Sequence, residues 1–386
     1  MQVLRKAVAL ALGLAAAGAM AQVKVGIIAP FSGPFAHYGV LMKAGAEAYV
    51  SNQGGKLAGQ TVEFIFRDEG GPNPANTKTL AQELVIKDKV DYLGGIVFSP
   101  NAFAVAPVIQ ESKTPMVIFN AATSDITTKS DFYLRTSYTL WQVTVPMAQH
   151  AAKKGIKKVV TAVTDYAPGV DAENAFKAEF AKHGGQVVES IRMPVRTTDF
   201  GPFAQRIKAS GAQAVYVFLP GGPPNLGFVK AYQENGLRQA GIEFLGTAET
   251  DEFDLQKFGD SALGLQTAFH YSGVHDSAAN KMFVAALAKQ NKDAVANYAS
   301  VGAWDGMYVI HKMIEATGGK RDGDKAMAAA KTLKWESPRG PVGIDPATRH
   351  ITQNVYLRTV EKGAGGMLVN REVQNFGAHA DHGLGK

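Results

Sequence analysis

Short apolar runs alternate along most of the chain with longer segments of helical periodicity, and few folds accept this pattern. Residues 90–97 form an apolar run with β-branched side chains, which is typical of a buried parallel strand. Residues 102–109 follow with apolar side chains at helical spacing, and residues 116–119 form the next apolar run. The same alternation starts at residue 24 and resumes near residue 140. It predicts an α/β protein with doubly wound parallel sheets.

Hydroxyl-bearing and small residues follow two neighbouring strands of this predicted sheet. Ser99 comes directly after the first strand, and Thr123 and Ser124 come after the second. A βαβ unit is right-handed, so both exit loops lie at the same sheet edge, where ligands of open α/β sheets bind. We interpret the loops as a seat for a carboxylate, because small residues and helix N-termini expose N–H donors. Ordinary helix N-capping would use the same residue types, and the residues alone leave both interpretations open.

The first residues have the pattern of a secretory signal. Arg5 and Lys6 precede a short apolar run over residues 8–18, and residues 19–21 read Ala-Met-Ala. This predicts a signal peptide over residues 1–21 and a mature chain that begins at Gln22. The apolar run is too short to act as a membrane anchor, and no later segment is long and apolar enough to be one. We therefore expect an exported protein.

Composition and motifs exclude several function classes. The chain has no cysteine, which excludes disulfides and thiolate sites. The net charge of +6 comes from scattered basic residues, so nucleic acid is not an expected partner. The sequence contains no GxSxG, HExxH, GxxxxGK[ST] or GxGxxG motif, and His379 with His382 do not make a metal site. We expect no enzymatic activity, no metal and no cofactor.

Several segments resemble the periplasmic substrate-binding proteins of ABC transporters, in the leucine/isoleucine/valine-binding (type I, Venus flytrap) family. The resemblance rests on the order and spacing of KVGIIAPFSGPFAHYG, GGKLAGQTVEFIFRDEG, NAATSD, DFGPFAQRIKASGAQAVYVF and KWESPRGPVGIDPATRHITQNVYL. It covers essentially the whole mature chain, although no single segment is highly specific.

The resemblance implies two lobes joined by three crossings, with the ligand in the cleft between them. The sequence adds that the β–α alternation is interrupted near residues 133–141 and that a β-hairpin follows residue 339. Together these predict lobe 1 from residues 22–137 and 271–344, lobe 2 from residues 138–270 and 345–375, and a mobile tail over residues 376–386.

The resemblance also implies the site residues. In amino-acid binders of this family a serine and an Ala-Ala-Thr loop hold the carboxylate, and these correspond to Ser99, Ala121, Ala122 and Thr123. An acid from the second lobe pairs with the ammonium, and the best match is Glu249, with Asp251 or Glu252 as alternatives. Side-chain pocket positions correspond to Tyr38, Tyr166, Gly221 and Trp304, although a tryptophan on an amphipathic helix, as at Trp304, is more often a core residue.

The implied function is the capture of a small carboxylate-bearing solute in the periplasm for an ABC importer. The partners would be that solute and the permease subunits of the inner membrane, and we expect a monomer. A branched-chain or other apolar amino acid is the first expectation for the ligand. An aromatic acid of the hydroxybenzoate or cinnamate type is the alternative, and a regulatory receptor would share the fold.

Overall fold

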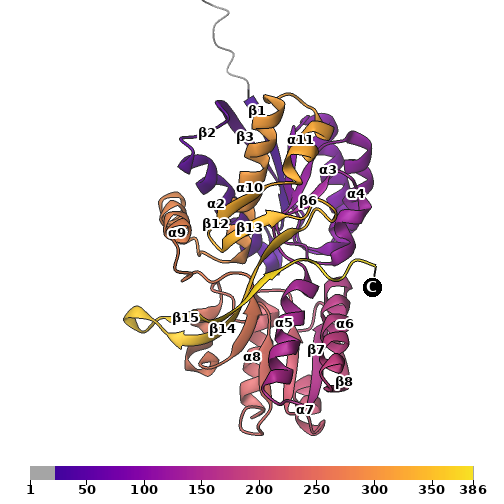
Figure 1. The fold of residues 1–386 in the computed structure, drawn as a ribbon, viewed down its shortest axis with the longest axis vertical. Helices are drawn as coiled ribbons and strands as arrows, with labels where there is room; N and C mark the ends of the chain where they lie inside the picture. Colours follow the sequence, from indigo (N-terminus) through magenta and orange to yellow (C-terminus); the bar gives the residue numbers. More distant parts are fainter. Residues whose placement is uncertain (1–21, 386) are drawn as a thin grey trace, which may run out of the picture.

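The computed structural model describes residues 22–385, so the predicted signal peptide lies outside the described residues. Two lobes are stacked along the long axis of the molecule, each built around its own sheet (Figure 1). The alternation of strands and helices predicted from the sequence is confirmed in both.

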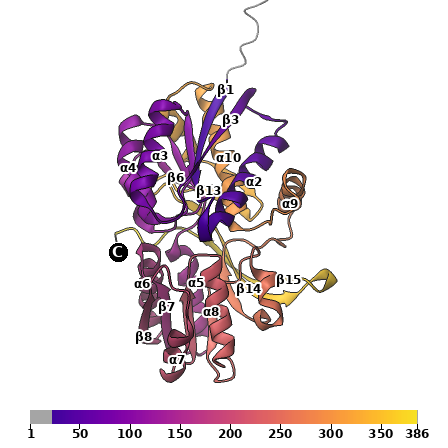
Figure 2. The same cartoon turned by 180° about the vertical axis from the view of Figure 1, so that it is seen from behind.

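The first sheet has the strand order β2-β3-β1-β4-β5-β6, and every neighbouring pair is parallel except β2–β3. Helices α3 and α4 cover one face of this sheet, and α2 and α10 cover the other (Figure 2). The elements are β1 (Gln22–Ala29), α2 (Ala36–Asn52), β2 (Lys56–Leu57), β3 (Gln60–Asp68), α3 (Pro74–Gln82), β4 (Tyr92–Gly95), α4 (Ser99–Ser112), β5 (Met116–Ile118), η3 (Ser124–Lys129) and β6 (Tyr133–Arg135).

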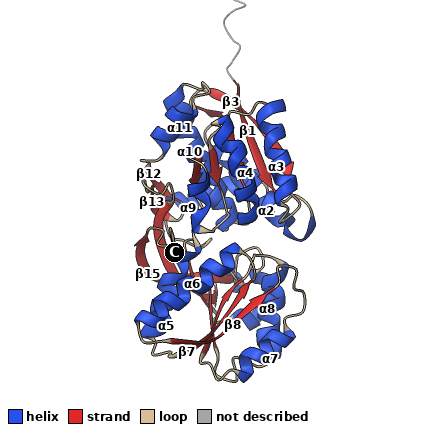
Figure 3. Cartoon of the chain, turned by 90° about the vertical axis from the view of Figure 1, so that its right-hand side faces the viewer, coloured by secondary structure: helices blue, strands red, loops and turns tan. Residues whose placement is uncertain are grey.

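The second sheet continues the pattern with parallel strands in the order β11-β10-β9-β7-β8. Helices α5 and α6 pack together on one of its faces, and α7 and α8 pack on the other (Figure 3). The elements are α5 (Leu140–Lys153), β7 (Lys158–Thr164), α6 (Ala167–Lys182), β8 (Gln186–Met193), α7 (Gly201–Ala209), β9 (Ala214–Phe218), α8 (Pro223–Glu234), β10 (Glu243–Gly246), η4 (Leu255–Ala262) and β11 (Gln266–Phe269).

After β11 the chain returns to the first lobe and then ends in antiparallel strands. The returning helices are α9 (Ala278–Gln290), α10 (Tyr298–Thr317) and α11 (Gly323–Ala330). The final strands are β12 (Lys334–Ser337), β13 (Gly340–Ile344), β14 (Ile351–Lys362) and β15 (Leu368–His379). The predicted hairpin is confirmed, because β13 pairs antiparallel with β14, and β14 extends the second sheet beside β11.

Small residues let helix α10 lie close to its neighbours in the first lobe. A Cβ atom on Gly45 of α2 would collide with the carbonyl of Ser300, and one on Gly302 would collide with the carbonyl of Phe119. The close approach places the first turn of α10 beside the carboxyl ends of β4 and β5. Tyr298, the first residue of the helix, is brought to the cleft in this way.

The C-terminal tail differs from the mobile segment that the sequence predicts. Strand β15 continues to His379 and pairs with β14 over most of its length. The carboxylate of Asp381 is fully buried and accepts hydrogen bonds from Ser124 and Thr139. A composition rich in glycine and histidine suggested mobility, but Gly383 is needed here because a side chain would collide with the Trp141 ring.

Candidate ligand-binding site

A cavity lies between the lobes at the carboxyl ends of the parallel strands. Its lobe 1 wall follows β4 and β5, and its lobe 2 wall follows β7, β9 and β10, which is where open α/β sheets bind ligands. The lining is mostly apolar and aromatic. The residues are Tyr38, Val97, Phe98, Asn120, Ala122, Tyr138, Tyr166, Pro168, Phe218, Leu219, Pro220, Ala248 and Tyr298.

Residues 120–124, here called the seat loop, are held by a hydrogen bond to Ser99. The Ser99 hydroxyl accepts a hydrogen bond from the Thr123 N–H at 3.2 Å, and both residues are buried. The Thr123 hydroxyl and the side-chain oxygen of Asn120 are buried and have no partner among the described residues. Buried polar atoms are normally paired, so these two are candidates to bind a ligand. Ser99, Ala121, Ala122 and Thr123 therefore lie together, although only Ala122 of the four lines the cavity.

Arg135 lies directly behind the seat loop and was missed from the sequence. Its guanidinium is fully buried and donates to the Thr123 carbonyl at 2.6 Å and to the Tyr138 carbonyl at 3.1 Å. Burial lowers the pKa of Arg135 to about 10, so it stays charged at neutral pH. The sequence signal was one arginine at the end of an otherwise apolar β6, a position where a buried charge needs partners.

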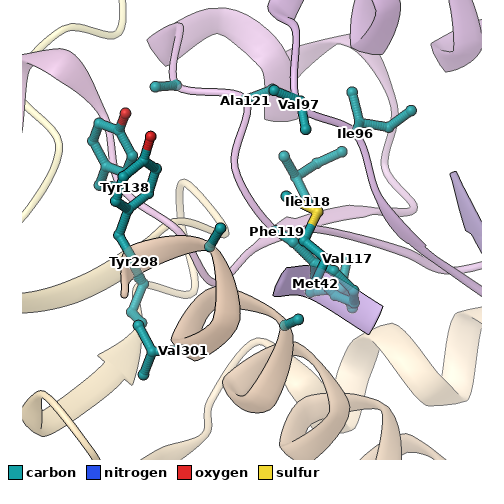
Figure 4. Close-up of a cluster of buried hydrophobic side chains, with 14 of the residues drawn as sticks. Met42, Ile96, Val97, Val117, Ile118, Phe119, Ala121, Tyr138, Tyr298 and Val301 are labelled. Atoms are coloured by element: carbon teal, nitrogen blue, oxygen red, sulfur yellow. The ribbon is translucent and has the colours of Figure 1, made fainter. Parts of the chain in front are cut away.

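Four tyrosines line the cavity with flat aromatic rings that end in hydroxyl groups. The Tyr38 hydroxyl contacts that of Tyr298 and accepts a hydrogen bond from the Gly221 N–H of lobe 2 at 3.0 Å. The rings of Tyr138 and Tyr298 lie at right angles, and their hydroxyls point the same way in Figure 4. Burial raises the pKa of all these hydroxyls, so they remain neutral hydrogen-bonding groups. Tyr166, the fourth, stacks on Phe218.

Gly221 occupies a place where only glycine fits. A Cβ atom there would lie 2.8 Å from both the Tyr38 and the Tyr298 hydroxyl oxygens. The sequence assigned Gly221 to the pocket wall, and its backbone N–H is in fact the group that joins lobe 2 to Tyr38. Tyr138 and Tyr298 were not predicted, although the first lies in residues 133–141, where the β–α alternation of the sequence is interrupted.

Glu249 is buried but does not line the cavity. Its carboxylate accepts hydrogen bonds from the Leu219 N–H at 3.1 Å and from the N–H and hydroxyl of Thr247. Burial raises the pKa of Glu249 to about 7. Both carboxylate oxygens of Glu249 are therefore hydrogen bonded to Leu219 and Thr247, which follow β9 and β10 of the same lobe. No cavity-lining residue within the described chain carries a carboxylate.

The two alternative acids also lie outside the lining. Asp251 accepts hydrogen bonds from the Asn297 side chain and the Phe253 N–H, while its second oxygen is buried without a partner among the described residues. Burial and the neighbouring Glu252 hold the pKa of Asp251 well above its usual range. Glu252 accepts from the Gly273 N–H and from Asn370 on the side of the crossings.

Trp304 belongs to the core of the first lobe and not to the cavity, which corrects the sequence expectation. Its ring packs against Tyr49 of α2 and Phe283 of α9, each with a centroid distance of 5.2 Å. Tyr298 reaches the cavity from the first turn of α10. Trp304 comes six residues later, roughly 9 Å farther along the helix axis.

His37 makes a second contact between the lobes beside the cavity. Its ring stacks on Phe253 of lobe 2 at 4.6 Å, and a Cβ atom on Gly222 would lie 2.7 Å from it. The charged groups on the facing element are Lys257, which lies over the Phe253 ring, and Asp254, which pairs with Lys257. Burial, and secondarily Lys257, lower the pKa of His37 to about 4. The contact therefore requires neutral histidine.

Lowering the pH from about 7.5 to about 5.5 is expected to weaken ligand binding about tenfold more in the wild type than in His37→Gln. The pKa of His37 is about 4 in this structure, and it is expected to return toward the ordinary 6.5 when the lobes separate and expose the imidazole. Its contribution to closure is complete above pH 6.5 and is lost as the pH falls toward 4. The raised pKa values of Glu249 and Asp171 make their contributions to binding change with pH in the opposite direction. Both groups are present in the wild type and in His37→Gln, so these contributions cancel in the comparison. Calorimetry at both pH values tests this, and equal pH slopes would contradict it.

Residues 22–385 contain neither a candidate metal site nor a candidate membrane span. No group of three or more His, Cys, Asp or Glu side chains there is arranged to hold a metal ion. No helix in this part of the chain has the length and hydropathy needed to cross a membrane.

Comparison with known proteins identifies close relatives. Residues 22–365 match the family model described as periplasmic binding protein. A protein of Brucella melitensis biotype 1, named Leu/Ile/Val-binding protein homolog 6, is 54% identical over 374 residues, which cover 96% of each chain.

Solved structures agree in fold and in the class of protein. A solute-binding protein of an ABC transporter from R. palustris, in complex with 4-hydroxybenzoate, is 55% identical, with a TM-score of 0.91 over 94% of this chain and 99% of that one. One from Rhodopseudomonas palustris BisB5, in complex with 3,4-dihydroxy benzoic acid, is 43% identical, with a TM-score of 0.90 over the same shares. The two-lobed fold, the matching model and these relatives mean that the chain belongs to the periplasmic binding protein family, among the substrate-binding proteins of ABC transporters.

Proposed function

We propose that this protein captures a hydroxylated aromatic carboxylic acid for an ABC importer. The observation that carries the proposal is the cavity lining, which offers four tyrosines, two phenylalanines and an asparagine, but no carboxylate. Aromatic walls suit a flat ring, and an anionic ligand needs no acidic partner. The relatives with bound 4-hydroxybenzoate and 3,4-dihydroxy benzoic acid support the same ligand class.

The ligand carboxylate is expected at the seat loop. The unpartnered Thr123 hydroxyl and the N-terminus of α4, which begins at Ser99, provide donors there. The positive charge of Arg135 behind the loop is offset by Asp171 and Asp381, so the carboxylate is expected to bind through the N–H and hydroxyl donors of the loop. The cavity has only about 10 Å³ of free volume in this structure, so the aromatic walls must separate before a ring can enter between the tyrosines. A ring hydroxyl can then pair with the side-chain oxygen of Asn120 or with a tyrosine hydroxyl.

Binding involves no chemical step in this proposal. Tyr38 and Gly221 come from different lobes and are hydrogen bonded to each other, so a ligand that contacts both lobes beside them stabilises the closed arrangement and shifts the hinge equilibrium. The closed protein then presents both lobes to the permease subunits in the inner membrane. We expect it to act in the periplasm as a monomer.

An apolar amino acid is the second candidate ligand. One observation favours it, namely the buried and unpartnered oxygen of Asp251, which lies near Tyr38 and Tyr298. The Leu/Ile/Val-binding names of curated relatives point the same way. The raised pKa of Asp251 weighs against it, because a neutral carboxyl is a poor partner for an ammonium.

Saturating 4-hydroxybenzoate is expected to stabilise the purified protein by about 2.7 kcal/mol at a concentration of about 100 Kd. The reason is that a ligand bound only by the folded state raises the free energy of unfolding by RT ln(1 + [L]/Kd). Chemical denaturation with and without ligand measures the effect, and mass spectrometry of the ligand released on denaturation identifies any co-purified solute. Benzoate without the ring hydroxyl serves as the matched control. The proposal would be wrong if the protein released an amino acid on denaturation and neither aromatic acid changed its free energy of unfolding.

A further inference from the structure

The seat loop is held by three charged side chains from distant parts of the chain. The Thr123 carbonyl accepts from Arg135, the Ser124 N–H donates to Asp171 of α6 at 2.9 Å, and the Ser124 hydroxyl donates to Asp381 at 2.7 Å. The Thr123 N–H is bonded to Ser99, and the Ser124 carbonyl accepts from His350. Every polar group of Thr123 and Ser124 is therefore used, except the Thr123 hydroxyl.

Asp381 joins this loop to the start of lobe 2. Its Oδ1 accepts from the Ser124 hydroxyl and also from the Thr139 hydroxyl at 2.6 Å, and its side chain is 0% exposed. Thr139 is the N-cap of α5 and accepts in turn from the Gln142 N–H. One carboxylate oxygen thus fixes the seat loop and the first helix after the crossing relative to each other.

The tail around Asp381 packs closely against α5 and the seat loop. Gly383 lies against both the Trp141 ring of α5 and the Ser124 hydroxyl, where any Cβ atom would collide. Asp381 has opposite charge from the buried Arg135, whose pKa it raises, although burial has the larger effect. Since an isolated buried charge is costly, the two charges stabilise each other.

We propose that the C-terminal tail, residues 380–385, is a strap that holds the seat loop in its ligand-binding conformation, with Asp381 as the positioning residue. Without the carboxylate, Ser124 loses a hydrogen bond to a charged group but keeps those to Asp171 and His350. The loop then holds the unpaired Thr123 hydroxyl less precisely, although Ser99 and Arg135 still bind the Thr123 backbone. Ligand affinity thereby depends on the last residues of the chain, which do not line the cavity. The inference rests on the seat loop being the carboxylate site of the proposed function.

The test compares three single substitutions in the mature full-length chain. Asp381→Ala is expected to weaken 4-hydroxybenzoate binding about tenfold to a hundredfold, as the loss of charge-assisted hydrogen bonds does. Asp381→Asn keeps an acceptor oxygen for the two hydroxyls and is expected to fall between Asp381→Ala and the wild type. His382→Ala, at the exposed neighbouring residue, is the control and should change affinity no more than about twofold. Calorimetry gives Kd, and thermal unfolding of the ligand-free proteins gives stability.

If the tail stabilises only the fold and does not position the seat loop, the variants should behave differently. Asp381→Ala would then lower the unfolding temperature of the ligand-free protein and leave Kd unchanged, and this result would overturn the proposal. If Asp381→Ala does not fold, the graded loss of affinity in Asp381→Asn decides instead. If the wild type binds leucine and not 4-hydroxybenzoate, the ligand class is wrong, and the same variants are compared with leucine. Unchanged affinity for the bound ligand would then overturn the strap.

Discussion

Replacing Arg339 with Met is expected to lower the free energy of unfolding by about 3–5 kcal/mol, the usual cost of removing one partner of a buried ion pair. Arg339 and Asp305 are both 0% exposed, and their Nη2 and Oδ2 atoms lie 2.7 Å apart. The substitution leaves Asp305 with hydrogen bonds only from Ser337 and Trp335. These two do not neutralise the buried charge.

Arg339 also joins the segments at which the chain crosses between lobes. Its Nη1 donates to the Ser137 carbonyl at 3.2 Å and to the Gln353 side chain at 2.8 Å. Ser137 follows β6, and Gln353 lies in β14, so one guanidinium links the first crossing to the last. The variant is therefore expected to loosen the hinge as well as to lose stability.

The matched control is Arg371→Met on β15. Arg371 pairs with Glu361 at 3.6 Å, but the two side chains are 50% and 47% exposed, so its loss should cost about 0–1 kcal/mol. Urea denaturation of both variants measures the difference. The double variant Arg339→Met with Asp305→Leu should recover much of the loss, because no buried charge remains. Equal stability of the two single variants would contradict this account of the hinge.

The fold was predictable because its main signals are local. Parallel strands such as β1 and β4 are buried on both faces and read as apolar runs, and the helices between them repeat at the helical period. Strand β15 was missed because its exposed residues alternate with too few apolar ones. Its pairing is determined by β14, which the sequence pattern of β15 does not reveal.

Only those site residues that directly follow the ends of parallel strands were predictable from the sequence. Ser99 and Thr123 follow adjacent parallel strands, so their proximity follows from topology. Trp304 was misplaced because helical spacing does not tell which side of α10 faces the cavity. The role of Asp381 depends on Ser124 and Thr139, which are far away in the sequence, and that of Arg135 depends on how the loop after β5 folds back onto β6. No local pattern carries that information.

Glu249→Gln distinguishes the two ligand classes, and the wild type is expected to bind 4-hydroxybenzoate at least about two orders of magnitude more tightly than leucine. The reason is that leucine brings an ammonium, and an unpaired buried charge costs several kcal/mol. The Glu249 carboxylate is occupied by the N–H groups of Leu219 and Thr247 and does not line the cavity. It is therefore not available to pair with an ammonium.

The substitution should leave affinity for 4-hydroxybenzoate within about threefold, the range of an ordinary change outside direct contact. With a pKa of about 7, Glu249 is about half protonated near neutral pH, and glutamine resembles the neutral form. The NH2 group of glutamine replaces one acceptor oxygen beside a buried N–H, so a loss of stability of about 1–3 kcal/mol is expected at pH 7 without a matching loss of affinity. An amino-acid ligand paired with Glu249 would instead lose about two orders of magnitude or more, since breaking a buried pair costs roughly 3–5 kcal/mol. Calorimetric Kd values of both proteins for 4-hydroxybenzoate and leucine decide the question. Tight leucine binding that collapses in Glu249→Gln would assign the site to an amino acid.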